Sequence, residues 1–420
     1  MKIHRPLFDL LYGSPDRVRQ AAAAIGGDGS WAETIRLAEA WRVLPRLTTV
    51  VREHRLELTS SSTAALRSAT TRHAMKSGYV ARRAGELAQA LEEKGIEAVA
   101  FKGVATLARL HRSPAERMLS DIDLMVHEPD LERALKAIQG VGFALWIDGS
   151  LDDQRQFSER RVRKENYSVN LIDAEGLEVD LHYRLRGWAG QILGDGLWLR
   201  AGRVPLMGRP IAAVSPVDAI LLITHHALRN QLCPYPTLRD LGDLAGYWQG
   251  CGATWAVSEL ATLAKGSGLG APLLGLCRIL EEAGTMPAGD RGLATLREAL
   301  GGEARTEGDR LGEWFFELLE QPTLGGERMA DLFILLADPM SLPRLLRDRL
   351  VERRRSAGTP WRRKTEELRE RLAGSDTGRA RGLITSLAGL NRRQMRGLWW
   401  VVRAQRRAFA PPGDAHPHDG

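Results

Sequence analysis

The stretch 117–126, RMLSDIDLMV, places two aspartates inside an apolar segment that has the length of a β-strand. Aspartate is disfavoured in strands, so two of them one residue apart need an explanation. Because side chains alternate along a strand, Asp121 and Asp123 share one face, and Ile122 and Leu124 share the other. The apolar face can then be buried intact while the two carboxylates lie side by side.

Two neighbouring carboxylates repel each other unless a positive charge neutralises them. A hard divalent cation does this well, because Mg²⁺ takes one or two protein carboxylates and completes its shell with phosphates and water. Solvated carboxylates on an edge strand are the alternative. Ser120 is placed to cap or orient an aspartate, and Arg117 either to clamp a phosphate or to pair with Asp121.

A third carboxylate fits the same pattern. In 177–183, LEVDLHY, three apolar residues share one strand face and Glu178, Asp180 and His182 share the other. Carboxylates on adjacent strands can hold two metal ions, Mg²⁺ or Mn²⁺, which activate an attacking oxygen and stabilise a leaving pyrophosphate. We expect His182 to be a hydrogen-bonded structural residue, with the orientation of a metal ligand as the alternative.

The stretch 100–110, AFKGVATLARL, reads as a strand, a Lys102–Gly103 turn and a helix. Glycine allows the backbone to approach a phosphate closely, and the following helix N-terminus offers free N–H groups. Lys102 adds a positive charge. These features predict a phosphate-binding turn.

The combined motifs, Lys102–Gly103, Arg117, Ser120-Asp-Ile-Asp-Leu and Val179-Asp-Leu-His-Tyr-Arg, resemble the uncharacterised nucleotidyltransferase family of the polymerase-β-like superfamily. The resemblance covers roughly 95–250. It implies an α+β fold with a mixed sheet, and metal-dependent transfer of a nucleoside monophosphate from an NTP to a hydroxyl. It also implies that Asp121, Asp123 and Asp180 bind metal and that Lys102 and Gly103 bind phosphate.

The hydrophobic period divides the chain into four regions. Stretches such as 31–54 are helical in pattern, the period shortens after Gly95, and helical spacing returns at Pro216. The predicted regions are an N-terminal helical region, the nucleotidyltransferase core, a helical domain, and a basic helical tail with a disordered end (1–95, 96–210, 211–340 and 341–420).

Two groups in the predicted helical domain invite a functional interpretation. His225 and His226 are adjacent on a helix, so they cannot both face one site, and a structural role is favoured for each. Arg239, Asp240 and Asp243 are predicted to form a network on a helix surface.

The charge is unevenly distributed. Residues 341–420 hold 19 Lys and Arg against 8 Asp and Glu, a surplus of +11, whereas 1–340 carries −4. A basic tail suggests an anionic partner, RNA or a membrane surface. Packing of the tail helix and its Trp399–Trp400 pair on the protein body is the alternative.

The sequence also bears on compartment. Cys233, Cys251 and Cys277 form no C-x-x-C pair and are odd in number, which argues against a disulfide framework or zinc site. No signal peptide or membrane-spanning stretch is evident, so a cytoplasmic location is expected.

Three functions compete. The leading one is transfer to a hydroxyl of a small molecule, peptide or protein. The second is modification of RNA held by the tail, and the third is a catalytically silent nucleotide- or RNA-binding module. A silent module would be expected to have lost a carboxylate of the site, but Asp121, Asp123 and Asp180 are all present.

Overall fold

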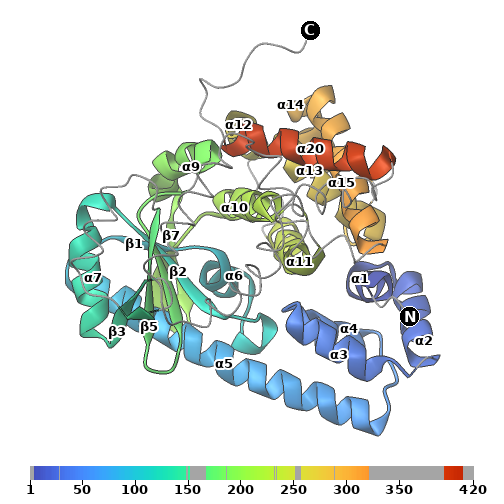
Figure 1. Cartoon of the computed structure of the whole chain (residues 1–420), viewed down its shortest axis with the longest axis horizontal. Helices are drawn as coiled ribbons and strands as arrows, with labels where there is room; N and C mark the ends of the chain where they lie inside the picture. The colour runs from blue at the N-terminus through green and yellow to red at the C-terminus, as the bar shows by residue number, and fades with distance from the viewer. Residues whose placement is uncertain are drawn as a thin grey trace, which may run out of the picture.

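The chain folds around one mixed β-sheet with helices on both faces (Figure 1). The computed structural model describes residues 4–27, 29–147, 150–151, 167–185, 187–230, 232, 234–250, 257–287, 289–320 and 392–409. The sheet order is β4-β3-β5-β6-β2-β1-β8-β7. The strands are β1 (Ala98–Ala100), β2 (Asp121–Val126), β3 (Phe143–Ile147), β4 (Ser150–Leu151), β5 (Ser168–Asp173), β6 (Glu178–His182), β7 (Gly202–Leu206) and β8 (Arg209–Ala213). The predicted α+β class with a mixed sheet is confirmed.

The strands that the sequence predicts around Asp121 and around Asp180 are present as β2 and β6. A tight turn joins β5 to β6, and Gly176 in it has a φ of +81°. The hairpin of β7 and β8 was not expected from the sequence. Its turn uses Met207 and Gly208, both at positive φ (51° and 81°), in place of the usual Asn-Gly or Asp-Gly signal.

One face of the sheet is apolar and is covered by α5 (Ser60–Glu93) and α7 (Leu131–Gly140) (Figure 1). The residues of β2 and β6 that point to this face are fully or almost fully buried: Ile122, Leu124, Val179 and Leu181. They are the alternate residues that the strand period assigns to the core. The other face carries the aspartates.

The polar face is partly covered by α6 (Lys102–Leu110), which packs on β2 and is contacted in turn by α10 (Pro216–Arg229) and α11 (Pro234–Gly250). Helix α10 begins where Ser215 accepts a hydrogen bond from the Asp218 backbone at 3.1 Å and Pro216 occupies the first turn. Helix α9 (Gly187–Arg200) contacts α10 near its N-terminus, where Arg200 pairs with the buried Asp218.

The helices before and after the sheet share one hydrophobic core. Phe8 of α1 lies 5.7 and 5.6 Å, between ring centroids, from Phe315 and Phe316 of α15. Tyr12 donates a 2.5 Å hydrogen bond to the carbonyl of Leu238 on α11. The helices that form this core, besides α10 and α11, include α1 (His4–Tyr12), α2 (Pro15–Gly27), α3 (Trp31–Ala40), α4 (Leu44–Glu53), α12 (Val257–Gly266), α13 (Gly270–Ala283), α14 (Arg291–Leu300) and α15 (Gly302–Glu320). The division of the chain into regions 1–95, 96–210, 211–340 and 341–420 stays a prediction.

The expected helix over 31–54 is two helices. Helix α3 ends at Ala40, Arg42 adopts a left-handed φ of +58°, and α4 begins at Leu44 with Pro45 in its first turn. Proline is accepted in the first turn of a helix but not in its interior, so it marks a new start. The break places Arg42 at a corner of the chain.

Helix α20 (Arg392–Phe409) packs on α15, α10 and α9. Val401, Ala404 and Ala408 are at most 1% exposed, and Gln405 donates a 3.0 Å hydrogen bond to the carbonyl of Leu228. Arg407 pairs with Glu307 at 2.7 Å. This part of the basic tail therefore packs on the protein body. Such packing was the alternative to recruitment of an anionic partner. The rest of 341–420 lies outside the described residues.

The structure describes only part of the chain that bears on the cysteines and on membrane-spanning segments. Cys277 is a free, buried thiol whose pKa burial raises to about 12, whereas Cys233 and Cys251 lie outside the described residues. Within the described ranges, every helix is too short or too polar to cross a membrane.

We predict that Ala404→Asp destabilises the protein by about 3 kcal/mol or more, because it buries an unpaired charge between α20 and the body. Chemical denaturation of the full chain measures this. Trp399→Asp on the same helix is the matched control: Trp399 is 51% exposed, so a change within about 0.5 kcal/mol is expected. Equal effects of the two substitutions would contradict the packing of α20.

Candidate active site

The parallel pairing of β2 with β6 brings three polar side chains together. Asp123 lies opposite Asp180 in the register, and Met125 lies opposite His182. One ligand atom from each of Asp123, Asp180 and His182 lies within 4.8 Å of the others. His182 Nε2 is 2.8 Å from Asp180 Oδ2 and 3.4 Å from Asp123 Oδ1. The expected closeness of Asp123 and Asp180 is therefore present in the structure.

Lys102 closes this group from the start of α6. Its φ is +49°, a left-handed value that side chains rarely adopt, and its ammonium donates to Asp123 Oδ1. The ring of Phe101 stacks edge-on against His182 with centroids 4.7 Å apart. Asp123 and His182 are 3% and 4% exposed, so the contacts form in a largely dry environment.

The charges in this group compensate one another. Burial alone would raise the pKa of Asp123, but the charges and hydrogen bonding of Lys102 and His182 lower that pKa well below its usual range. Burial would also raise the pKa of Asp180, and His182 lowers it instead. For His182, burial would lower the pKa and the two carboxylates raise it. Both carboxylates thus lie beside partners that favour their ionised form.

The same group fits a divalent cation. Asp180 Oδ1 and His182 Nδ1 are buried and have no hydrogen-bond partner among the described residues, and His182 Nε2 has only the two carboxylates beside it. Buried polar atoms of this kind normally have a partner. Two carboxylates are suitable ligands for Mg²⁺ or Mn²⁺. An imidazole ligand beside them favours Mn²⁺, because transition-metal ions bind nitrogen ligands more readily than Mg²⁺ does.

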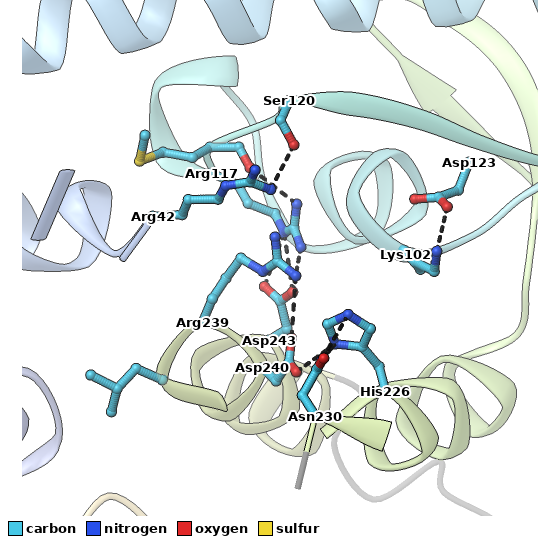
Figure 2. A network of polar contacts seen from close by, with 12 residues as sticks. Arg42, Lys102, Arg117, Ser120, Asp123, His226, Asn230, Arg239, Asp240 and Asp243 are labelled. Atoms are coloured by element: carbon cyan, nitrogen blue, oxygen red, sulfur yellow. Dashed lines mark hydrogen bonds and ion pairs between the residues drawn. The ribbon is translucent and has the colours of Figure 1, made fainter. Parts of the chain in front are cut away.

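Asp121 lies at the start of β2, opposite Glu178 and outside this three-residue group. Its Oδ1 accepts a 2.7 Å hydrogen bond from the hydroxyl of Ser120, and Arg42 donates to that hydroxyl at 2.7 Å (Figure 2). Ser120 thus orients an aspartate, the structural role it was expected to have.

Arg117 is buried and turned away from Asp121. Its Nε and Nη2 donate to Asp243 of α11, the shortest contact being 2.5 Å (Figure 2). Arg117 therefore pairs with Asp243 and not with Asp121, which was one of its two expected partners. To bind a phosphate, the other expected partner, Arg117 would have to separate from Asp243. A Cβ on Gly103 would approach Arg117 Nη1 to 2.9 Å, so glycine there accommodates this arginine.

Arg239, Asp240 and Asp243 do not form the surface network that the sequence predicted. Asp240 and Asp243 are 3% and 7% exposed, because α11 turns them inward against α10 and the sheet domain. His226 Nδ1 lies 2.7 Å from Asp240 Oδ2 (Figure 2). Burial would raise the pKa of Asp240, and the neighbouring His226 lowers it. His226 is thus structural, as expected.

The sequence analysis missed Arg42 and the role of Asp243. Arg42 is 78 positions from Ser120, and Asp243 is 126 positions from Arg117. Asp243 was assigned to a helix-surface network and Arg42 to no group, and only the packing of the helices against the sheet reveals their partners.

A family model described as "Uncharacterised nucleotidyltransferase" matches residues 27–283. A solved structure described as an antigenic nucleotidyltransferase-like protein from Paracoccidioides brasiliensis is similar over 49% of this chain and 91% of that chain, at 17% identity. Its TM-score of 0.29 is too low to bear on function. No curated protein gives a significant match.

We predict that Asp123→Asn and Asp180→Asn each weaken Mn²⁺ binding at least tenfold, about 1.4 kcal/mol, because each removes a charged ligand. Titration followed by electron paramagnetic resonance measures the free ion. Glu178→Gln is the control, since Glu178 is exposed and lies on the same face of the same strand as Asp180. Wild-type affinity in both aspartate variants would remove these residues from the metal site.

We predict that Asp243→Ala costs about 3–5 kcal/mol of stability, because it leaves the Arg117 guanidinium buried without its partner. Replacing both residues, Arg117→Met with Asp243→Leu, should recover most of the loss. Urea denaturation of the two variants makes the comparison. If the single variant were as stable as wild type, the pair would not anchor α11 to the sheet domain.

Proposed function

Because the chain belongs to the family of uncharacterised nucleotidyltransferases, we propose that it moves a nucleoside monophosphate from an NTP to a hydroxyl of a small molecule, peptide or protein. The observation that carries this proposal is the register of β2 and β6, which sets Asp123 opposite Asp180 beside Lys102. Family membership identifies an enzyme of nucleotidyl transfer, and the acceptor class is our inference.

The start of α6 supports binding of the donor phosphates. The first N–H groups of this helix have no side-chain cap, and they follow directly after Lys102 on the polar side of β2. Uncapped N–H groups at a helix N-terminus attract anions. We infer that Lys102 and this helix terminus hold the triphosphate, as the sequence predicted for Lys102 and Gly103.

The carboxylates support the acceptor side of the reaction. Asp180 is half-buried beside Asp123, so we infer that its carboxylate acts on the side of the attacking hydroxyl, as a metal ligand or as the proton acceptor. His182 contacts one oxygen of Asp180 and thereby fixes the orientation of the carboxylate. Asp121, at the start of β2, completes the predicted carboxylate set.

A divalent cation, Mg²⁺ or Mn²⁺, supplies positive charge for the developing negative charge on the transferring phosphate and the pyrophosphate. Asp123 and Asp180, with His182 beside them, are the residues that would hold it. Asp121 is the further ligand that we propose from the sequence.

RNA modification remains a weaker alternative. The described part of the tail packs on the protein body through Val401 and Ala408, so it offers no specific feature in favour of an RNA strand. Recruitment of RNA or a membrane by 341–420 stays a prediction of the charge distribution.

Incubation of the protein with each α-labelled NTP, Mg²⁺ or Mn²⁺ and cell extract tests the proposed function. We expect one acceptor to become labelled, pyrophosphate to be released, and a γ-labelled NTP to leave the acceptor unlabelled. Asp180→Asn should reduce transfer at least about a hundredfold, as expected for loss of a proton acceptor. Transfer of the γ label, or full activity in this variant, would refute the assignment.

A further inference from the structure

Two cationic residues reach β2 from strained backbone positions. Lys102 and Arg42 have φ values of +49° and +58°, in the left-handed region where glycine is the usual residue. Lys102 contacts Asp123, and Arg42 contacts Ser120 next to Asp121. These two left-handed positions bring both cationic side chains to the same strand, close to its two aspartates.

Arg42 forms no ion pair with a carboxylate of the described part of the chain. It follows the C-terminus of α3, where its own N–H donates to the Glu39 carbonyl at 3.1 Å and that of Val43 to the Ala38 carbonyl at 2.8 Å. Its side chain is half-buried and donates only to Ser120, and no carboxylate of the described residues lies within 4.0 Å of its nitrogens. A half-buried guanidinium without a counter-charge favours binding of an anion.

Arg239 of α11 faces the same place. Figure 2 shows the side chains of Arg42 and Arg239 extending toward the Arg117–Asp243 pair. Arg239 Nε is buried without a hydrogen-bond partner among the described residues, and Nη2 is 3.5 Å from Asp240 Oδ1.

The carboxylates nearest these guanidinium groups are already engaged. Asp243 pairs with Arg117, Asp240 is shared between Arg239 and His226, and Asp121 accepts from the Ser120 hydroxyl that Arg42 also contacts. A Cβ on Gly103 would lie 2.9 Å from Arg117 Nη1, so the group adjoins the proposed phosphate turn.

We propose that Arg42 and Arg239 form an anion subsite that binds a phosphate group beside β2. Guanidinium forks match phosphate oxygens, and charge-assisted hydrogen bonds of this kind are strong. The phosphate comes either from the distal end of the NTP or from a phosphorylated acceptor. The first source rests on the proposed function, whereas the subsite itself rests on the arginines.

Arg42→Gly separates this role from a structural one, because glycine suits the left-handed backbone that arginine strains. We expect its melting temperature to equal or exceed that of wild type. Its affinity for pyrophosphate, measured by calorimetry with Mg²⁺, should fall about ten- to a hundredfold, the equivalent of losing charged hydrogen bonds. Arg239→Ala should lower the same affinity.

Arg55→Gly is the matched control. Arg55 follows α4 just as Arg42 follows α3, with a φ of +51° and a hydrogen bond from the Leu56 N–H to the Val51 carbonyl at 3.0 Å. It is exposed, and it forms no ion pair or side-chain hydrogen bond within the described part of the chain. This variant should keep its stability and bind pyrophosphate like wild type.

Binding of NTP and NMP identifies the source of the phosphate. If Arg42→Gly weakens NTP but not NMP, the subsite holds the distal phosphates of the donor. If it weakens pyrophosphate but neither nucleotide, the subsite stands and serves a phosphorylated acceptor. Unchanged pyrophosphate binding in both Arg42→Gly and Arg239→Ala would overturn the subsite. A wild-type protein that binds pyrophosphate but no NTP would refute the proposed function while leaving the subsite in place.

Discussion

The parallel register of β2 and β6 is the constraint on which the candidate site depends. It sets Asp123 opposite Asp180 and puts both on the face opposite Ile122 and Val179. A slip of one residue would turn Asp180 into the apolar layer under α5 and α7 and bring Val179 or Leu181 beside Asp123. The buried apolar face therefore fixes the register, and the register in turn fixes the distance between the carboxylates.

Burying such a polar face costs free energy, and contacts from Lys102 and His182 offset that cost. Each contact lowers the pKa of a carboxylate, Asp123 or Asp180, that burial would otherwise raise. Removing one partner of such a buried group would leave an uncompensated charge. The same carboxylates stay ionised, which is the state that binding a divalent cation requires.

The strand alternation in DIDLMV and LEVDLH was enough to predict which residues share the polar face, because this pattern depends only on the backbone period. The other parts of the site depend on long-range packing. Arg42 and Asp243 approach the sheet from helices far away in sequence, and no local pattern indicates their partners Ser120 and Arg117. The left-handed conformations of Lys102, Arg42 and Met207 were equally hidden, since glycine is the residue that normally signals them. Burial of Asp240 and Asp243 was misjudged for the same reason: a charged helix face reads as solvated until its partners are known.

The extent of the family match gives these distant residues a further meaning. The resemblance in the motifs spans roughly 95–250, but the family model begins in α2 and ends at the end of α13, at residues 27 and 283. That range includes α3 with the corner at Arg42, and α11 with Asp243 and Arg239. Helices that precede and follow the sheet in the sequence share one hydrophobic core, so the contact of Phe8 with α15 helps to hold the N-terminal helices near β2. The helices are thus part of the unit that presents arginines to the edge of the carboxylate strand, and a sheet excised at 96–210 would keep Asp123 and Asp180 but lose the cations around Ser120.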